Sequence, residues 1–193
     1  WAIIEPLTPV PQWLPNLQEP LHHPRDMWDA VRYRARNGIP WSALPHDFPP
    51  WSTVFKWVQR MERQGVFEAV NDELRRQCRV AAGRDPEPTA ACIDSQSVKA
   101  SGMGGPSGFD GGKKVNGRKR HILVDVLGLV LAVLVTPACV ADREVAAPLI
   151  MSVHREHALK HVWADAAYNG DAIEKLKADT GITFETGMRD PAA

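Results

Sequence analysis

Two aspartates, Asp94 and Asp165, stand where short apolar runs give way to polar residues. The first run is A-A-C-I-D-S-Q-S-V-K at 90–99, and the second is W-A-D-A-A-Y-N-G at 163–170. A strand that ends in a carboxylate is how a rigid sheet holds a metal ligand. Two such strands side by side would bring both carboxylates within reach of the same Mg²⁺ ions, because hard cations bind carboxylate oxygens.

Such a pair is suited to phosphodiester chemistry. Two Mg²⁺ ions about 4 Å apart can activate the attacking oxygen and stabilise the leaving one. We expect Asp94 to bridge the ions and Asp165 to bind one of them. The alternative is that each aspartate caps a turn at the end of its strand. Their separation of 71 positions does not decide between these two interpretations, because only the sheet can bring the residues together.

A dense basic run, K-K-V-N-G-R-K-R, occupies positions 113–120. It has five positive charges and no acid, and it follows a glycine-rich segment, 101–112, that we expect to be a mobile loop. Such a run suits phosphate contacts, although a solvated strand entry is the alternative. His121 comes next and is the histidine we expect closest to the active face. The predicted DNA contacts here are Lys113, Lys114, Arg118, Lys119 and Arg120.

The composition excludes several classes of protein. The 193 residues include 23 basic and 23 acidic residues, so no overall charge indicates nucleic-acid binding. Three scattered cysteines disfavour a disulfide framework and a zinc site, and they fit a reducing cytosol. The longest apolar run, 126–135, is well short of the roughly 20 residues that cross a bilayer. We therefore expect a cytoplasmic protein with no membrane association.

The first 80 residues have a helical pattern. Apolar residues at helical spacing predict helices over 26–37, 53–64 and 66–80, with Gly38 ending the first and Ser52 capping the second. Three helices with short connections are compatible with a small all-α, helix-turn-helix-like DNA-binding domain, 1–80. Basic residues on two of these helices are candidate DNA contacts, although a solvated helix face is equally compatible with them. They are Arg32, Arg36, Lys56 and Arg60.

A change of pattern follows the proline-rich linker at 81–88. The remaining segment, 89–193, reads as an α/β domain in which a hairpin interrupts alternating strands and helices, which favours a mixed sheet with flanking helices. The order fits a ribonuclease-H-like fold whose central first strand pairs with the strand carrying the second acid. The expected strands are 89–94, 119–125, 129–136, 161–165 and 182–185, with helices at 142–157 and 169–180.

Four segments, 38–54, 93–99, 112–129 and 163–170, together resemble bacterial insertion-sequence transposases of the insertion-sequence-five branch of the DDE superfamily. The resemblance implies a ribonuclease-H-like catalytic domain in which two aspartates and a glutamate bind Mg²⁺ or Mn²⁺. Asp94 matches the first acid and Asp165 the second. The glutamate is expected on a later helix in a V-E-R-T-F-like context, which is absent. Neither Glu174 nor Glu185 stands in that context, so we expect a C-terminally truncated chain with an incomplete catalytic domain.

These features together predict a DNA transposase that hydrolyses phosphodiesters at insertion-sequence ends and transfers the strands, impaired here by the missing third acid. The alternative is a catalytically inactive DNA-binding fragment that acts as an inhibitor or is a relic. A structure-specific nuclease on the same fold is a weaker third hypothesis. The expected partners are double-stranded DNA, both terminal inverted repeats and target, and further copies of the chain in a synaptic complex. The expected location is the bacterial cytoplasm, with the nucleoid.

Overall fold

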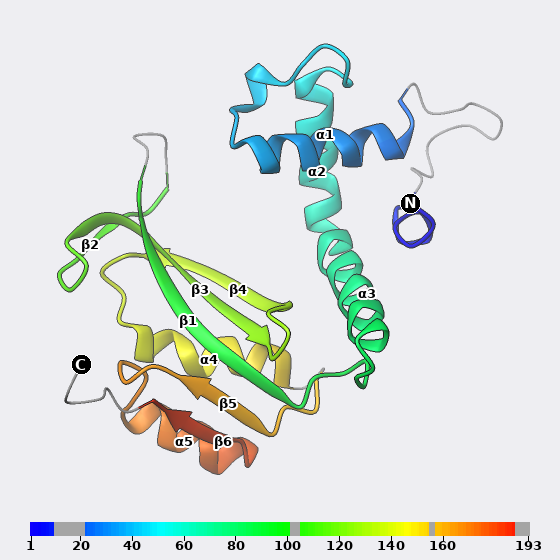
Figure 1. Ribbon diagram of the computed structural model, residues 1–193. Coiled ribbons are helices and arrows are strands. Elements are labelled where there is room, and N and C mark those ends of the chain that lie inside the picture. Colours follow the sequence, from blue (N-terminus) through cyan, green and yellow to red (C-terminus); the bar gives the residue numbers. More distant parts are fainter. Residues whose placement is uncertain (10–21, 101–104, 155–156, 188–193) are drawn as a thin grey trace. The chain divides into compact units, whose positions relative to one another are not determined.

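The computed structural model describes residues 1–9, 22–100, 105–154 and 157–187 of the chain. It divides into two compact units, Trp1–Leu74 and Arg75–Ala193 (Figure 1). By this division the linker predicted at 81–88 lies inside the second unit, together with the end of the helix before it. Each unit has its own core, so each is described by itself.

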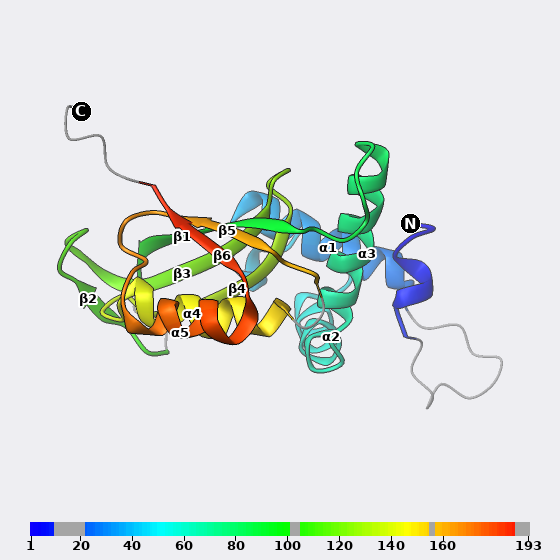
Figure 2. The ribbon, with the colours of Figure 1, turned by 90° about the horizontal axis from the view of Figure 1, so that it is seen from below.

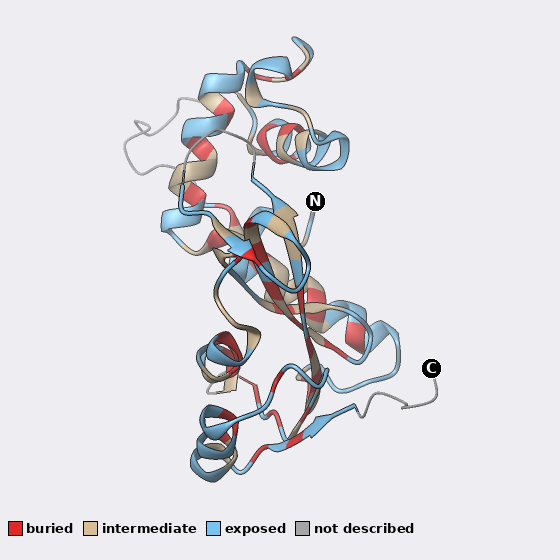
Figure 3. Ribbon diagram, turned by 90° about the vertical axis from the view of Figure 1, so that its left-hand side faces the viewer, coloured by how far each residue is buried: buried red, intermediate tan, exposed pale blue. Residues whose placement is uncertain are grey.

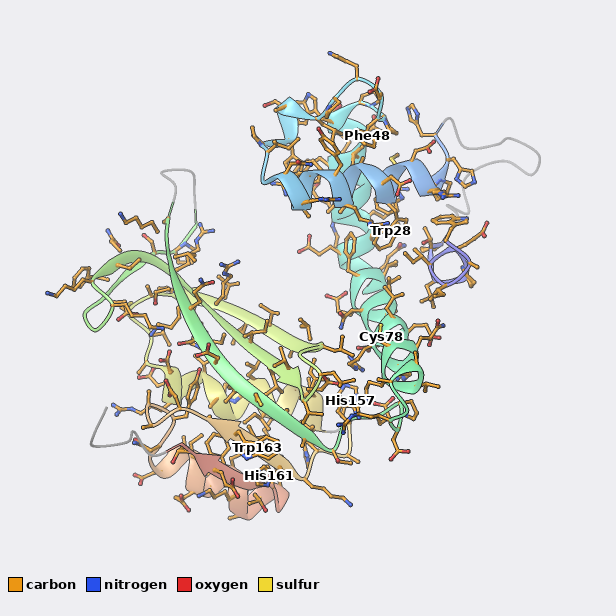
Figure 4. All side chains as sticks on the ribbon, in the orientation of Figure 1. Trp28, Phe48, Cys78, His157, His161 and Trp163 are labelled. Carbon is orange, nitrogen blue, oxygen red and sulfur yellow. The ribbon has the colours of Figure 1, made fainter. Side chains whose placement is uncertain are left out.

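The first unit is helical, as predicted. Its tryptophan cluster forms the core: the Trp28 ring packs edge-to-face on Trp57 and Phe67, with centroids 5.5 and 5.2 Å away (Figure 4). The Trp28 indole N–H donates to Thr8 Oγ1 at 3.0 Å, so the buried polar atom is satisfied. The elements are η1 (Glu5–Leu7), α1 (Pro24–Asn37), η2 (Trp41–Ala43), α2 (Trp51–Arg63) and α3 (Val66–Ala81), the last of which continues into the second unit.

One helix end in the first unit lies where it was predicted, and another differs from the prediction. Gly38 ends α1 in the left-handed region at φ 62°, as predicted. The second helix begins at Trp51 rather than after Ser52, because the carbonyl of Pro50 already accepts from the backbone N–H groups of Thr53 and Val54. Ser52 therefore lies within the first turn of α2 and does not cap it.

The second unit is a six-stranded mixed sheet with α4 (Asp142–His154) and α5 (Asp171–Thr180) along one face (Figure 2). The central strand β1 pairs antiparallel with β3 and parallel with β5, as the ribonuclease-H-like arrangement predicts. The order is β2-β3-β1-β5-β6, with β4 also paired to β3. The strands are β1 (Ala90–Lys99), β2 (Gly108–Asp110), β3 (Val115–Asp125), β4 (Val130–Pro137), β5 (His161–Ala164) and β6 (Thr183–Thr186).

Two boundaries differ from the predicted ones in a way that matters for the site. The first strand does not end at Asp94 but continues to Lys99, because Ser95–Lys99 pairs with the basic half of β3. The glycine-rich segment predicted as a loop contains the short strand β2, which pairs with the start of β3. Its residues 101–104 lie outside the described part of the chain.

The apolar core of this unit lies between the sheet and the two helices. Alternate strand residues such as Ala91, Ile93 and Val162 point into it and are almost fully buried. Figure 3 shows buried segments in red along the strands and helices. The inner faces of α4 and α5 complete the core with Leu149, Ile150, Ile173 and Leu176. This core fixes the register of the sheet, because a one-residue slip would turn its apolar side chains to the other face.

Candidate active site on the open face of the sheet

The face of the sheet opposite α4 and α5, here called the open face, presents the residues that alternate with the core. Cys92 and Asp94 on β1 follow this alternation, as do His161 and Trp163 on β5. The rings of His161 and Trp163 lie against each other, with centroids 4.2 Å apart (Figure 4). Asp94 and Trp163 are exposed, so side chains on this face are accessible to solvent, whereas those on the other face pack in the core.

Asp94 lies on β1, and Asp165 directly follows Ala164, the last residue of β5. The parallel pairing joins Ala90 to His161 and Cys92 to Trp163, and each aspartate is two positions beyond the second of these pairs. Both aspartates are exposed. Asp94 Oδ1 accepts from the Ser95 N–H at 2.7 Å, and Asp165 Oδ1 accepts from the Ala167 N–H at 2.9 Å. One predicted acid is therefore on β1, and the other comes just after the neighbouring strand β5.

The donor set of this pair fits a hard divalent cation. Mg²⁺ takes oxygen ligands and keeps several waters, so two carboxylates are an adequate protein contribution. Within the described ranges there is no group of three or more His, Cys, Asp or Glu residues that could hold a metal. Glu185 lies on β6, where it accepts from the Trp163 indole N–H at 3.0 Å, and Glu174 pairs with Lys177 on α5.

Two arginines of the basic run lie on the open face beside Asp94. Ile122 is the cross-strand partner of Asp94, and the next two residues on that face of β3 are Arg120, opposite Gln96, and Arg118, opposite Val98. Arg120 is exposed and donates to Gln96 Oε1 at 2.7 Å. Lys114 is exposed in the turn before β3. Arg118 and Arg120 thus share a face of the sheet with Asp94.

Lys119 and Lys113 have other partners. Lys119 points to the helix side of the sheet and is 5 % exposed; its Nζ lies 3.0 Å from Asp142 Oδ1 and 3.6 Å from Asp110 Oδ2. The Lys113 amino group donates to the Ser95 carbonyl at 2.8 Å. Lys119 is thus enclosed between two carboxylates, whereas Lys113 remains exposed with its amino group on the Ser95 carbonyl.

His121 was expected near the active face, and this expectation is wrong. It alternates with Arg120 and therefore points to the opposite, helix-covered side of β3, where it is fully buried. Its Nε2 lies 3.0 Å from Thr136 Oγ1. Burial lowers the pKa of its imidazole, while the neighbouring Asp142 carboxylate acts in the opposite direction.

The candidate DNA contacts of the first unit lie on its surface. Arg32, Arg36 and Lys56 are exposed, and Arg60 is half-buried. Arg32 also lies 4.0 Å from Asp29, three residues earlier on α1. Sequence reasoning missed Tyr168, which is fully buried three residues after Asp165. The available signal was a large aromatic residue shortly after Asp165, since aromatic side chains are often buried.

Comparison with known proteins adds the family. Residues 1–71 match the family model described as a putative transposase of the IS4/5 family, and residues 85–192 match the transposase DDE domain. The chain belongs to the DDE transposase family. The resemblance to insertion-sequence transposases seen in four sequence segments is thereby confirmed over nearly the whole of this transposase chain. The search of curated proteins found no match.

Among solved structures, this transposase chain is similar to the catalytic core domain of BIV integrase. The sequences are 18 % identical, the TM-score is 0.37, and the match covers 53 % of this chain and 56 % of that domain. The chain thus matches little more than half of that domain's length. Within the described residues, none of the helices is long and apolar enough to span a bilayer.

Proposed function

We propose that the acid pair Asp94 and Asp165 binds Mg²⁺ or Mn²⁺ and that the chain acts on the phosphodiester backbone at insertion-sequence ends, by hydrolysis followed by strand transfer. The observation that supports the proposal is the register of β1 and β5: Asp94 and Asp165 are each two positions beyond the pair Cys92–Trp163. Membership of the DDE transposase family supports the same chemistry.

The residues of the chain would divide the work as follows. Asp94, held inside an unbroken strand, and Asp165, held by its turn, would be the metal ligands. A bound divalent metal supplies Lewis-acid activation for phosphodiester cleavage. Arg120 and Arg118 would neutralise phosphates beside the acids, because charge-assisted hydrogen bonds from arginine suit phosphate oxygens.

Duplex DNA is the proposed partner of both units. The cations that we assign to it are the exposed Arg32, Arg36, Lys56, Lys114 and Arg120 and the half-buried Arg60 and Arg118. Lys113 and Lys119 are left out, since one donates to the Ser95 carbonyl and the other is buried between two acids. Terminal inverted repeats, target DNA, a synaptic homo-oligomer and a place in the bacterial cytoplasm with the nucleoid belong to the same proposal.

Two acids are fewer than the three that the family resemblance implies. We therefore propose that this chain alone binds the metal and cleaves DNA weakly. A second candidate function, occupation of element ends without cleavage, is favoured by the same observation, because within the described residues no third metal-binding side chain joins Asp94 and Asp165. Such a protein would inhibit transposition by an intact enzyme.

The test measures Mn²⁺ binding by electron paramagnetic resonance and Mn²⁺-dependent nicking of a supercoiled plasmid. We expect Asp94→Asn and Asp165→Asn each to weaken Mn²⁺ binding at least tenfold and to abolish nicking. The matched control is Glu185→Gln, which removes a carboxylate on the neighbouring strand and should change neither. Nicking that survives Asp94→Asn would refute the assignment. Salt-sensitive DNA binding without any nicking would favour the second candidate.

A further inference from the structure

Tyr168 is a large polar side chain that the catalytic proposal does not use. It is 0 % exposed and belongs to the core between the sheet and the two helices. Its hydroxyl group is sealed from solvent and has no hydrogen-bond partner of good geometry within the described part of the chain. A fully buried ring of this size holds the segment that carries it in place, because protein interiors are close-packed.

The backbone ties Tyr168 directly to Asp165. The Tyr168 N–H donates to the Asp165 carbonyl at 3.2 Å, which closes a turn, and the Ala167 N–H holds the Asp165 carboxylate. Asn169 braces the same turn from outside, donating to the Ala166 carbonyl at 2.9 Å. The turn thus has the acid at its first residue and the buried ring at its fourth.

The phenol also lies near the other acid. Burial raises the pKa of Tyr168, and Asp142, Asp94 and Asp165 are all near enough to raise it further, while the Ser95 hydroxyl acts in the opposite direction. Ser95 is the residue whose N–H holds the Asp94 carboxylate. Tyr168 is thus joined to Asp165 through the backbone of the turn, while its side chain belongs to the core between the sheet and the helices.

We propose that Tyr168 is a positioning residue: its buried ring fixes the turn 165–168 against the core, so that Asp165 stays level with Asp94. The position after β5 needs such an anchor, because β5 ends at Ala164 and the strand pairing no longer holds Asp165. The inference rests on the proposed function, since it assigns Tyr168 a role in the metal site.

The experiment compares Tyr168→Leu, Tyr168→Met and Tyr168→Phe in the full chain. Two quantities are measured: the Mn²⁺ dissociation constant, by electron paramagnetic resonance, and the amide exchange rate of residue 168, by nuclear magnetic resonance. We expect Leu and Met to weaken Mn²⁺ binding at least tenfold and to speed exchange at least tenfold. Phe, which keeps the ring, should stay within threefold on both. Met serves if Leu fails to fold, because it fills a similar volume without a planar ring.

The control is Phe184→Leu, which shortens a buried side chain of the same core on β6, outside the turn. It should lower stability but leave Mn²⁺ affinity and exchange at residue 168 within threefold of wild type. The inference is overturned if the Leu and Met variants fold and bind Mn²⁺ like wild type, or if Phe184→Leu weakens binding as much. If wild type does not bind Mn²⁺, or if Asp165→Asn does not reduce the binding, the proposed function fails. The amide exchange rate of residue 168 in the Leu and Met variants still shows whether Tyr168 anchors the turn.

Discussion

Asp94 and Asp165 are 71 positions apart in the sequence, and so are the paired residues of β1 and β5, Ala90 with His161 and Cys92 with Trp163. Each acid is thus two positions beyond the last pair of this ladder, Cys92 with Trp163. Because neighbouring strands lie about 4.8 Å apart, residues at one level of adjacent strands are within reach of a shared ligand. The separation of 71 positions, which the sequence alone could not interpret, is the same as the offset between paired residues of β1 and β5.

Arg120 is expected to contribute to DNA affinity and Lys175 is not. Arg120→Gln removes an exposed cation from the open face beside Asp94, whereas Lys175 is an exposed cation on α5, on the helix-covered side. We expect Arg120→Gln to weaken binding of a 30-base-pair duplex and to reduce the slope of log K against log salt by about one. Fluorescence anisotropy at several salt concentrations measures both. An equal effect of Lys175→Gln would contradict a DNA surface on the open face.

Lys119 is expected to contribute to stability rather than to DNA binding. Lys119→Met leaves Asp110 and Asp142 without their shared cation in a mostly buried site, which should cost roughly 2–4 kcal/mol of unfolding free energy. Urea unfolding followed by circular dichroism measures the loss. Lys114→Met, five residues earlier and exposed, should leave stability nearly unchanged and weaken DNA binding instead. A Lys119→Met protein with wild-type stability would show that the buried pairing contributes little.

Arg79 is expected to hold the end of α3 to the second unit. Its guanidinium pairs with the buried carboxylate of Asp125, whose other oxygen accepts from the N–H groups of Leu127 and Leu129 at 2.8 and 2.9 Å. Arg79→Met strands a buried charge and should cost about 3–5 kcal/mol in chemical unfolding.

The control for Arg79 is Arg76→Met. Arg76 pairs with the part-exposed Glu87, so its loss should cost no more than about 1 kcal/mol. The double variant Arg79→Met with Asp125→Asn should recover part of the lost stability, because it removes the stranded charge. Equal costs for the two arginines would argue that the buried pair has no special weight.

Acid is expected to weaken the second unit through Asp110. Hydrogen bonds from the Ser97 hydroxyl and the Lys113 N–H lower the pKa of Asp110 to about 2, from an ordinary value of 3.8. A lowered pKa stabilises the folded state above pH 3.8, and this contribution is lost as the pH falls toward 2. We expect Asp110→Asn to be destabilised relative to wild type by on the order of 1–2 kcal/mol at pH 5 and by clearly less at pH 3. Urea titrations at both pH values test it, and a pH-independent difference would contradict it.

Periodicity and turn residues were enough to predict most of the elements. The apolar stripes of α1, α2 and α3 and the apolar runs of β1, β4 and β5 are visible in the sequence because each faces a core. The far half of β1, S-Q-S-V-K, has no such stripe. It is a strand because it pairs with the basic half of β3, and a partner distant in the sequence leaves no local pattern.

The side on which each basic residue points could not be read from the run itself. Arg118, Lys119, Arg120 and His121 alternate between the two faces of β3, so neighbours of similar charge have opposite environments. What encloses Lys119 is a pair of acids, Asp110 on β2 and Asp142 on α4, which only the folding of the sheet and helix brings to it. Tyr168 was missed for a related reason: its role depends on where the turn after β5 meets the core.

The strand β1 runs unbroken from Ala90 to Lys99, so strand geometry fixes the spacing of the residues on its open face. Residues on one face of a strand recur about every 6.7 Å, so the levels of Asp94, Gln96 with Arg120, and Val98 with Arg118 are fixed multiples of that step. No hinge separates the cations from the acid. A nucleic-acid backbone gripped at the arginine levels would therefore present a predetermined phosphate to the carboxylates, and the choice of which bond meets them would be built into the strand spacing.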